Sequence, residues 1–130
     1  MKIYIASFFD TRARLIPHAR RLEAAGHEIT SDWLYEAENA FYGTVTDGYR
    51  LACGLGDLQG IKDASLVLLD TIDQTPRGGR EVEFGVALGH GIPVIRIGPE
   101  RNVFHKLVFK SFATWGEALP EIEAIHRRHA

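Results

Sequence analysis

Cysteine is almost absent from this chain: Cys53 is the only one among 130 residues. A single thiol cannot form a disulfide within the chain, and it disfavours a thiolate metal site. We therefore expect a reducing compartment and interpret Cys53 as a small, buried hydrophobic residue. The six histidines are not spaced like metal ligands either, so the sequence predicts no metal site.

A strong net charge and long apolar runs are also lacking. The formal net charge is -2 at pH 7, and the basic side chains are mostly spread along the chain, which argues against a nucleic acid or a membrane surface as the main partner. No apolar run approaches the length of a membrane span, and the first residues form a strand pattern rather than a secretory signal. We expect a cytoplasmic protein.

The phosphate-binding motifs of NAD- and ATP-dependent proteins are missing. Gly54, Gly56 and Gly60 do not follow a predicted strand, as the dinucleotide fingerprint requires, and no Gly-Lys-Ser/Thr phosphate loop occurs. The sequence therefore predicts no NAD or ATP site, and we expect no cofactor.

What the chain does contain is a regular alternation of strand and helix patterns. Apolar and β-branched runs predict strands at residues 2–6, 27–33, 64–70 and 93–97, and a fifth strand within 108–113. Helical spacing of apolar residues predicts helices at 11–25, 46–62 and 115–129, and a short helix within the stretch 76–93. This order predicts one α/β domain over residues 1–130, a flavodoxin-like (Rossmann-like) three-layer sandwich with a five-stranded parallel sheet.

The middle of the chain combines a helical pattern with a cluster of aromatic residues. The helix at 46–62 carries apolar residues at helical spacing: Tyr49, Ala52, Leu55, Leu58 and Ile61. Before it lies a segment rich in aromatic residues: Trp33, Tyr35, Phe41 and Tyr42. Aromatic side chains there are suited either to stacking on a base or to an interface between subunits.

The stretch from Pro76 to Pro93 carries the most chemical information. A glycine-rich loop leads into its helix, which is predicted to hold Glu81 and Glu83 near its first turn. The positive end of the helix dipole favours the ionised form of a carboxylate there, which would keep it available as a nucleophile near neutral pH. The two residues lie about 200° apart around a helix, so only one of them can face a given cleft.

The predicted topology brings this helix to a ligand site. In an open parallel sheet, ligands bind outside the carboxyl ends of the strands. This rule collects the loops at residues 7–10, 70–79 and 98–102 at one mouth of the sheet. Glu83 is predicted to point into that mouth, so the sequence indicates a cleft that contains a carboxylate.

These residues resemble the nucleoside 2-deoxyribosyltransferase family, whose relatives include nucleoside 5'-monophosphate N-glycosidases. The resemblance covers most of the chain. It is carried by residues 3–6, 56–61, 66–70, 83–85 and 91–93. The separation of Asp57 from Glu83, 83 − 57 = 26 residues, is also similar to that of the family.

The resemblance implies catalytic roles for three residues. Glu83 would attack the anomeric carbon of a 2-deoxyribosyl group and form a covalent glycosyl-enzyme, while Tyr4 would hydrogen-bond that carboxylate. Asp57 would contact the leaving base and handle its proton, so the two carboxylates would have the different tasks that retaining glycosyl transfer requires. Attack by a second base gives transfer, which is the first candidate function, and attack by water gives hydrolysis.

The resemblance also implies contacts with the substrate from the mouth loops. The residues expected to make them are Ser7, Phe9, Asp70, Arg77, Gly79 and Asn102. Asn102 is similar to a late asparagine of the family that reaches the sugar of a neighbouring subunit's substrate, so a homo-oligomer of two or more subunits is expected. The implied partners are a nucleoside or nucleotide and a free nucleobase.

Two departures from the family pattern leave alternatives open. Many transferases of the family carry another acid shortly before the nucleophile, but residues 75–80 contain none, and Asp70 or Asp73 would have to replace it. Four arginines lie in or beside the mouth loops: Arg12, Arg14, Arg77 and Arg80. Arginine suits a phosphate, which makes a nucleoside 5'-monophosphate N-glycosidase the second candidate. The missing acid also leaves room for a third, a non-catalytic nucleotide-binding module.

Overall fold

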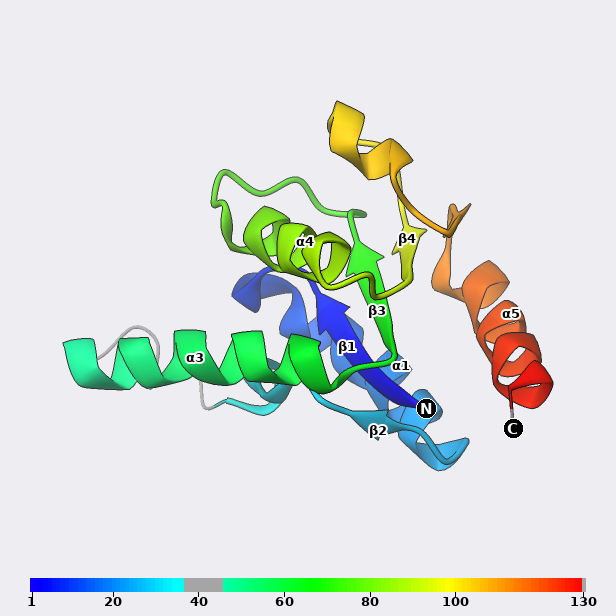
Figure 1. The fold of residues 1–130 in the computed structure, drawn as a ribbon, viewed down its shortest axis with the longest axis horizontal. Coiled ribbons are helices and arrows are strands. Elements are labelled where there is room, and N and C mark those ends of the chain that lie inside the picture. The colour runs from blue at the N-terminus through cyan, green and yellow to red at the C-terminus, as the bar shows by residue number, and fades with distance from the viewer. Residues whose placement is uncertain (37–45, 130) are drawn as a thin grey trace.

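The computed structural model describes residues 1–36 and 46–129, which contain a five-stranded, all-parallel sheet (Figure 1). Its strands are β1 (Lys2–Ala6), β2 (Glu28–Ile29), β3 (Leu66–Asp70), β4 (Val94–Ile97) and β5 (Lys110–Phe112). They are arranged in the order β2-β1-β3-β4-β5, which is the flavodoxin-like order. The predicted α/β fold and its parallel sheet are confirmed.

Helices cover both faces of this sheet. They are α1 (Arg12–Ala24), α3 (Asp47–Asp63), α4 (Gly79–Gly89) and α5 (Trp115–Arg128), with short 3-10 turns η1 (Phe9–Thr11), η2 (Asp32–Tyr35) and η3 (Val103–Lys106). Helices α3 and α4 lie in front of the sheet in Figure 1 and α1 lies behind it. His18 of α1 stacks on Trp115 of α5, with ring centroids 4.6 Å apart, so these two helices share the second face.

The core lies along the central strands. All five residues of β3 are buried, as are residues 3–6 of β1. This pattern is expected of strands that are covered on both faces. It fixes the register Tyr4 to Val67 and holds the carboxyl ends of β1 and β3 side by side, which is where the candidate site forms.

The second strand is much shorter than the predicted 27–33. Strand β2 pairs with β1 only at Glu28 and Ile29. The backbone N–H of Ile5 then donates to the Ser31 side chain at 3.1 Å, so a hydroxyl replaces the next backbone acceptor of the ladder. The chain leaves the sheet there and continues into η2, which carries Trp33.

Helix α3 lies where it was predicted, but most of its apolar residues face outward. Ile61 is completely buried, whereas 59% of Leu55 and 65% of Leu51 are exposed. Figure 1 shows why: the first half of α3 extends beyond the sheet, and only its last turns lie over β1. The described helices include none that is long and apolar enough to cross a membrane.

Candidate active site

Glu83 lies in the second turn of α4, above the carboxyl half of β1. The Tyr4 hydroxyl donates a hydrogen bond to Glu83 Oε2, and Tyr4 is completely buried. Glu83 Oε1 is also buried and has no hydrogen-bond partner within the described residues. One carboxylate oxygen is therefore held in place while the other is left for a ligand.

The protonation of Glu83 differs from the expectation of an ionised carboxylate. Burial raises the pKa of Glu83 to about 8, although the hydrogen bond from Tyr4 lowers it, and the nearby Asp57 raises it further. The helix dipole acts mainly within the first turn, where Glu81 rather than Glu83 is placed. Loss of hydration penalises the charged form, so the surroundings of Glu83 disfavour the ionised carboxylate that the sequence predicted.

Gly60 brings α3 close enough to β1 for Asp57 to reach the same place. A Cβ at Gly60 would lie 2.4 Å from the carbonyl oxygen of Thr30 and 3.2 Å from the Tyr4 ring. Only glycine allows this approach without displacing its neighbours. Asp57 precedes Gly60 by almost one helical turn, and it lines a cavity together with Glu83.

The pKa of Asp57 is raised as well, to about 6, first by burial and then by the charges of Asp32 and Glu36. Asp57 and Glu83 thus form a pair of partly desolvated carboxylates whose pKa values differ. Such a pair is able to divide the roles of nucleophile and proton donor.

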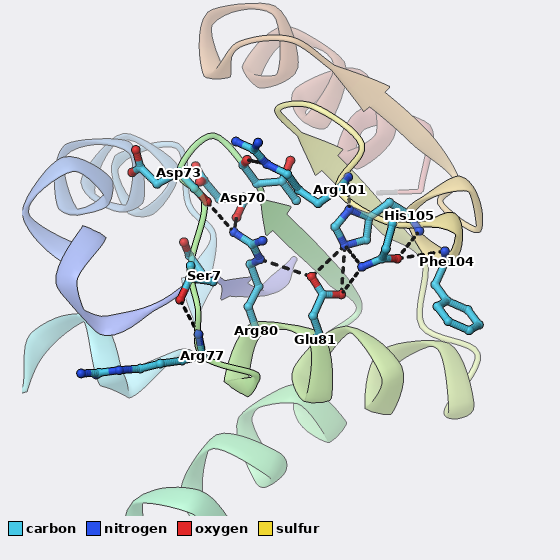
Figure 2. Close-up of polar contacts among 12 residues, drawn as sticks. Ser7, Asp70, Asp73, Arg77, Arg80, Glu81, Arg101, Phe104 and His105 are labelled. Carbon is cyan, nitrogen blue, oxygen red and sulfur yellow. Dashed lines mark hydrogen bonds and ion pairs between the residues drawn. The ribbon is translucent and has the colours of Figure 1, made fainter.

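Glu81, the alternative nucleophile, points toward η3 instead (Figure 2). His105 Nδ1 accepts the backbone N–H of Arg101 at 3.0 Å, so Nε2 carries the proton and donates to the Glu81 carboxylate at 2.9 Å. Desolvation raises the pKa of Glu81, but the hydrogen bonds from His105 and Asn102 outweigh it and the pKa falls below its ordinary value. This carboxylate is occupied in joining α4 to η3.

Asn102 is also occupied within its own chain. Its Oδ1 accepts the backbone N–H groups of Phe104 and His105 at 2.9 and 3.2 Å and caps η3, and its Nδ2 donates to Glu81 at 3.2 Å. The expected contact between Asn102 and a neighbouring subunit stays a prediction, and it would require some of these bonds to break.

A cavity of about 210 Å³ opens beside Glu83. Its wall brings together six residues singled out from the sequence: Ser7, Phe9, Asp57, Arg77, Gly79 and Glu83. Ser7 and Phe9 follow β1, Asp57 lies in the second half of α3, and the other three lie just before α4 or in its first turns. The structure thus gathers most of the predicted site residues around one space.

Asp70 is not at this cavity. It is completely buried, and its carboxylate accepts two hydrogen bonds from Arg14, at 2.8 and 3.0 Å, and one from the Trp115 indole at 2.7 Å. Asp73 accepts from Arg14 as well, at 2.9 Å. Both acids hold the loop after β3, and neither is among the residues that line the cavity beside Glu83.

The four arginines of the mouth loops have different tasks. Arg14 holds Asp70, and Arg80 donates to the Asp73 carbonyl at 2.8 Å. Arg12 donates to the carbonyl of Glu36. Arg77 and Arg80 both line the cavity with Ser7. Because Arg80 is buried and Arg77 is exposed, Arg77 is the arginine better placed to meet a ligand.

A second cavity of about 210 Å³ adjoins the first, because Trp33 and Asp57 line both. Its wall also holds Asp32 and Glu36, which the sequence analysis did not single out. Asp32 and Glu36 lie on either side of Trp33, where the predicted strand ends and no clear helix or strand pattern follows in the sequence. Two acids near an aromatic residue were the only sign in the sequence that a site could form there. Phe41 and Tyr42, two of the aromatic residues noted in that segment, lie outside the described residues.

Cys53 differs from its predicted place. It is half-buried and lines the second cavity rather than packing in the core. In the part of the chain that the structure describes, no group of three His, Cys, Asp or Glu side chains is arranged to hold a metal ion.

Solved structures that share this fold include the following three proteins. A 2-deoxyribosyltransferase from Bacillus psychrosaccharolyticus matches with a TM-score of 0.71 and 22% identity, over 91% of this chain and 90% of that chain. A conserved protein from Enterococcus faecalis V583 matches with a TM-score of 0.71 and 19% identity, over 95% and 98%. The CMP N-glycosidase BcmB from Clostridium botulinum matches with a TM-score of 0.63 and 16% identity, over 95% and 99%. Neither a family model nor a curated protein matches the chain. The likenesses confirm the fold that the family resemblance implies.

Proposed function

We propose that this chain, which shares its fold with a 2-deoxyribosyltransferase and a CMP N-glycosidase, cleaves the N-glycosidic bond of a nucleoside or nucleotide. One observation carries the proposal: a buried Glu83 has one oxygen held by Tyr4 and the other without a partner among the residues that the structure describes, on the wall of a cavity that Asp57 shares. This is the arrangement that a glycosyl-transferring carboxylate pair needs.

In the first step, Glu83 Oε1 attacks the anomeric carbon and forms an ester bond to the sugar. The bond between that carbon and the base nitrogen breaks, and its electron pair goes to the base. Asp57, in its protonated form, donates a proton to the leaving base. Tyr4 keeps its hydrogen bond to Oε2, which orients the attacking oxygen.

In the second step, an acceptor attacks the anomeric carbon and releases Glu83. A second nucleobase as acceptor gives transfer of a deoxyribosyl group, with Asp57 taking the proton of the incoming base, and this is the first candidate activity. The likeness to the 2-deoxyribosyltransferase supports it.

A second candidate is hydrolysis of a nucleoside 5'-monophosphate, in which water is the acceptor. It is favoured by the cationic end of the cavity, where Arg77 lies near Ser7 (Figure 2). Gly78 caps α4 without a side-chain hydrogen bond, and N–H groups at a helix start favour an anion. The likeness to a CMP N-glycosidase supports this candidate too.

The proposed assembly is a homo-oligomer. Exposed apolar residues of α3 and α4, Leu51, Leu55 and Val82, line a hollow whose wall also includes Asp57 and Glu83. A second copy covering this hollow would remove apolar surface from water. It would also close the candidate site from one side.

The test is to incubate the protein with deoxyinosine, with and without adenine, and with deoxynucleoside 5'-monophosphates, and to separate the products by chromatography. Deoxyadenosine that forms only with adenine supports transfer, and free base released mainly from the monophosphates supports hydrolysis. We expect Glu83→Gln to lose at least about 10³-fold in rate. Activity that survives this change contradicts the proposal. Absence of any turnover, with equal ligand binding by the parent and the variant, favours the non-catalytic module.

A further inference from the structure

The second cavity is acidic from end to end within the residues described. Asp32, Glu36 and Asp57 line it, and its described lining contains no lysine, arginine or histidine. Trp33 forms the junction with the cavity beside Glu83. The cationic residues Arg77 and Arg80 line the first cavity and not the second.

The two cavities together therefore form one cleft, with arginines in the wall of one part and three acidic residues in the wall of the other. A ligand whose sugar lies at Glu83 has its base on the side of Asp57, the residue that handles the base proton in the proposed mechanism. Asp57 and Trp33 also line the acidic cavity, so that cavity adjoins the side on which the base lies. A volume of about 210 Å³ is of the size that a nucleobase ring requires.

The structure holds these acidic groups in place. The Tyr49 hydroxyl donates to Glu36 Oε2 at 2.5 Å, and Arg12 donates to the Glu36 carbonyl. The Trp33 indole N–H donates to the Ile5 carbonyl at 3.0 Å, which fixes the ring at the junction. Asp32 begins η2 directly before Trp33, so its position is set by the same turn.

An ionised carboxylate accepts hydrogen bonds but cannot donate them. The amino groups of cytosine and adenine are donors, whereas the corresponding keto oxygen of uracil or thymine is an acceptor. Placing a keto oxygen against a carboxylate opposes two groups of lone pairs, and such unfavourable contacts contribute to specificity. Asp32 and Glu36 also raise the pKa of Asp57, so their charges act within this cavity.

We propose that Asp32 and Glu36 select substrates whose nucleobase carries an exocyclic amino group. This inference rests on the N-glycosidic function proposed for Glu83, and it adds the substrate class. It applies equally to transfer and to hydrolysis, since both begin with the same departing base.

The experiment compares matched pairs that differ in one amino or keto group: cytidine with uridine and adenosine with inosine, each as 2'-deoxynucleoside and as 5'-monophosphate. The parent is expected to show a kcat/KM ratio of about 10- to 100-fold in favour of the amino member, the range of a charge-assisted hydrogen bond. Asp32→Asn and Glu36→Gln keep the size of the side chain but add a donor, so at least one should lower the ratio about fivefold or more by improving the keto substrate. Asp47→Asn, which removes an exposed carboxylate at the start of α3, is the matched control and should leave the ratio unchanged.

Binding of labelled cytidine and uridine monophosphates, measured by equilibrium dialysis, separates the two proposals. Turnover without a preference for amino bases, or a preference that both variants retain, overturns the role of Asp32 and Glu36 while the function of Glu83 stands. No turnover together with tenfold tighter binding of cytidine monophosphate, lost in the variants, overturns the function and keeps the selectivity. Neither turnover nor binding overturns both.

Discussion

Glu81 and Glu83 are two positions apart in α4, yet their environments shift their pKa values in opposite directions. Glu81 meets the donors of His105 and Asn102, and its pKa is lowered despite its desolvation. Glu83 is buried against Tyr4, one of its oxygens has no partner in the described parts of the chain, and its pKa is raised to about 8. The satisfied carboxylate of Glu81 suits a structural contact, and the partly unsatisfied carboxylate of Glu83 is the one that the proposed function uses.

These pKa values predict a bell-shaped dependence of kcat/KM on pH. Glu83, with a pKa of about 8, must lose its proton, and Asp57, with a pKa of about 6, must keep its own. Because the residue that must be ionised has the higher pKa, this state is a minor fraction of the enzyme at every pH. That fraction is largest near pH 7 and falls below about pH 6 and above about pH 8. Because Glu83 and Asp57 interact, the two apparent pKa values of the profile describe the pair and not either residue alone. Initial rates at low substrate from pH 5 to 9 check this, and a flat profile would contradict it.

Replacing Tyr4 by phenylalanine should move the alkaline limb upward. The Tyr4 hydrogen bond lowers the pKa of Glu83, so its loss raises that pKa and leaves less ionised nucleophile at pH 7. We expect kcat/KM at pH 7 to fall about 10- to 100-fold. Tyr35→Phe, which removes a bond to the surface residue Glu23, is the control. An unchanged alkaline limb in Tyr4→Phe would show that the bond does not tune Glu83.

At the scale of elements, close packing at Gly60 determines where Asp57 lies. A methyl group at position 60 would meet the Thr30 carbonyl at 2.4 Å, so Gly60→Ala should lower the free energy of unfolding by about 1–3 kcal/mol and reduce activity. Gly48→Ala, in the same helix, meets only Thr46 Oγ1 at 3.9 Å and should stabilise by up to about 1 kcal/mol. Urea denaturation of both variants checks this, and equal stabilities would contradict it.

Asp70 joins three elements, because it ends β3 and binds Arg14 of α1 and Trp115 of α5. Asp70→Asn leaves the partly buried Arg14 without its main counter-charge, and we expect a loss of about 3 kcal/mol in the free energy of unfolding. Asp73 binds the same arginine but is 45% exposed. Asp73→Asn should therefore cost less than about 1 kcal/mol. If the two variants unfold at the same denaturant concentration, the greater burial of Asp70 does not make its ion pair more important for stability, and the prediction is wrong.

The sequence predicts what depends on local pattern. The apolar runs at β1 and β3 and the glycine-rich start of α4 identify their elements correctly, because burial on both sheet faces and turn chemistry are visible in neighbouring residues. The length of strand β2 was overestimated. The Ser31 hydroxyl takes the place of a backbone acceptor in the ladder, and no pattern in the neighbouring residues indicates this.

The candidate site was predictable only in part. Tyr4 and Glu83, 79 positions apart, were paired through the family resemblance rather than through any local signal. The bonds of Arg14 to Asp70 and of His105 to Glu81 also join distant segments. From the sequence alone, each of these side chains could equally have been expected to contact a ligand. Contacts of this kind depend on the path of the loops, which residue patterns do not specify.

At the scale of the whole molecule, the apolar hollow between α3 and α4 predicts self-association. Leu55→Glu places a charge in that face, where Leu55 is 59% exposed, and should shift the protein to monomers and lower its activity. Phe109→Glu, at an equally exposed apolar position away from α3 and α4, is the control. Light scattering over a range of concentrations measures the size. A parent protein that is monomeric throughout would contradict the proposed assembly.

The central claim is that Glu83 becomes covalently bound to the sugar. The most direct measurement is to quench the protein with acid during turnover of a deoxynucleoside or its 5'-monophosphate and to map the modified peptide by mass spectrometry. The account predicts the added mass of the glycosyl group on Glu83 in the parent and none in Glu83→Gln. A glycosyl group on another residue, or full turnover by Glu83→Gln, would contradict it.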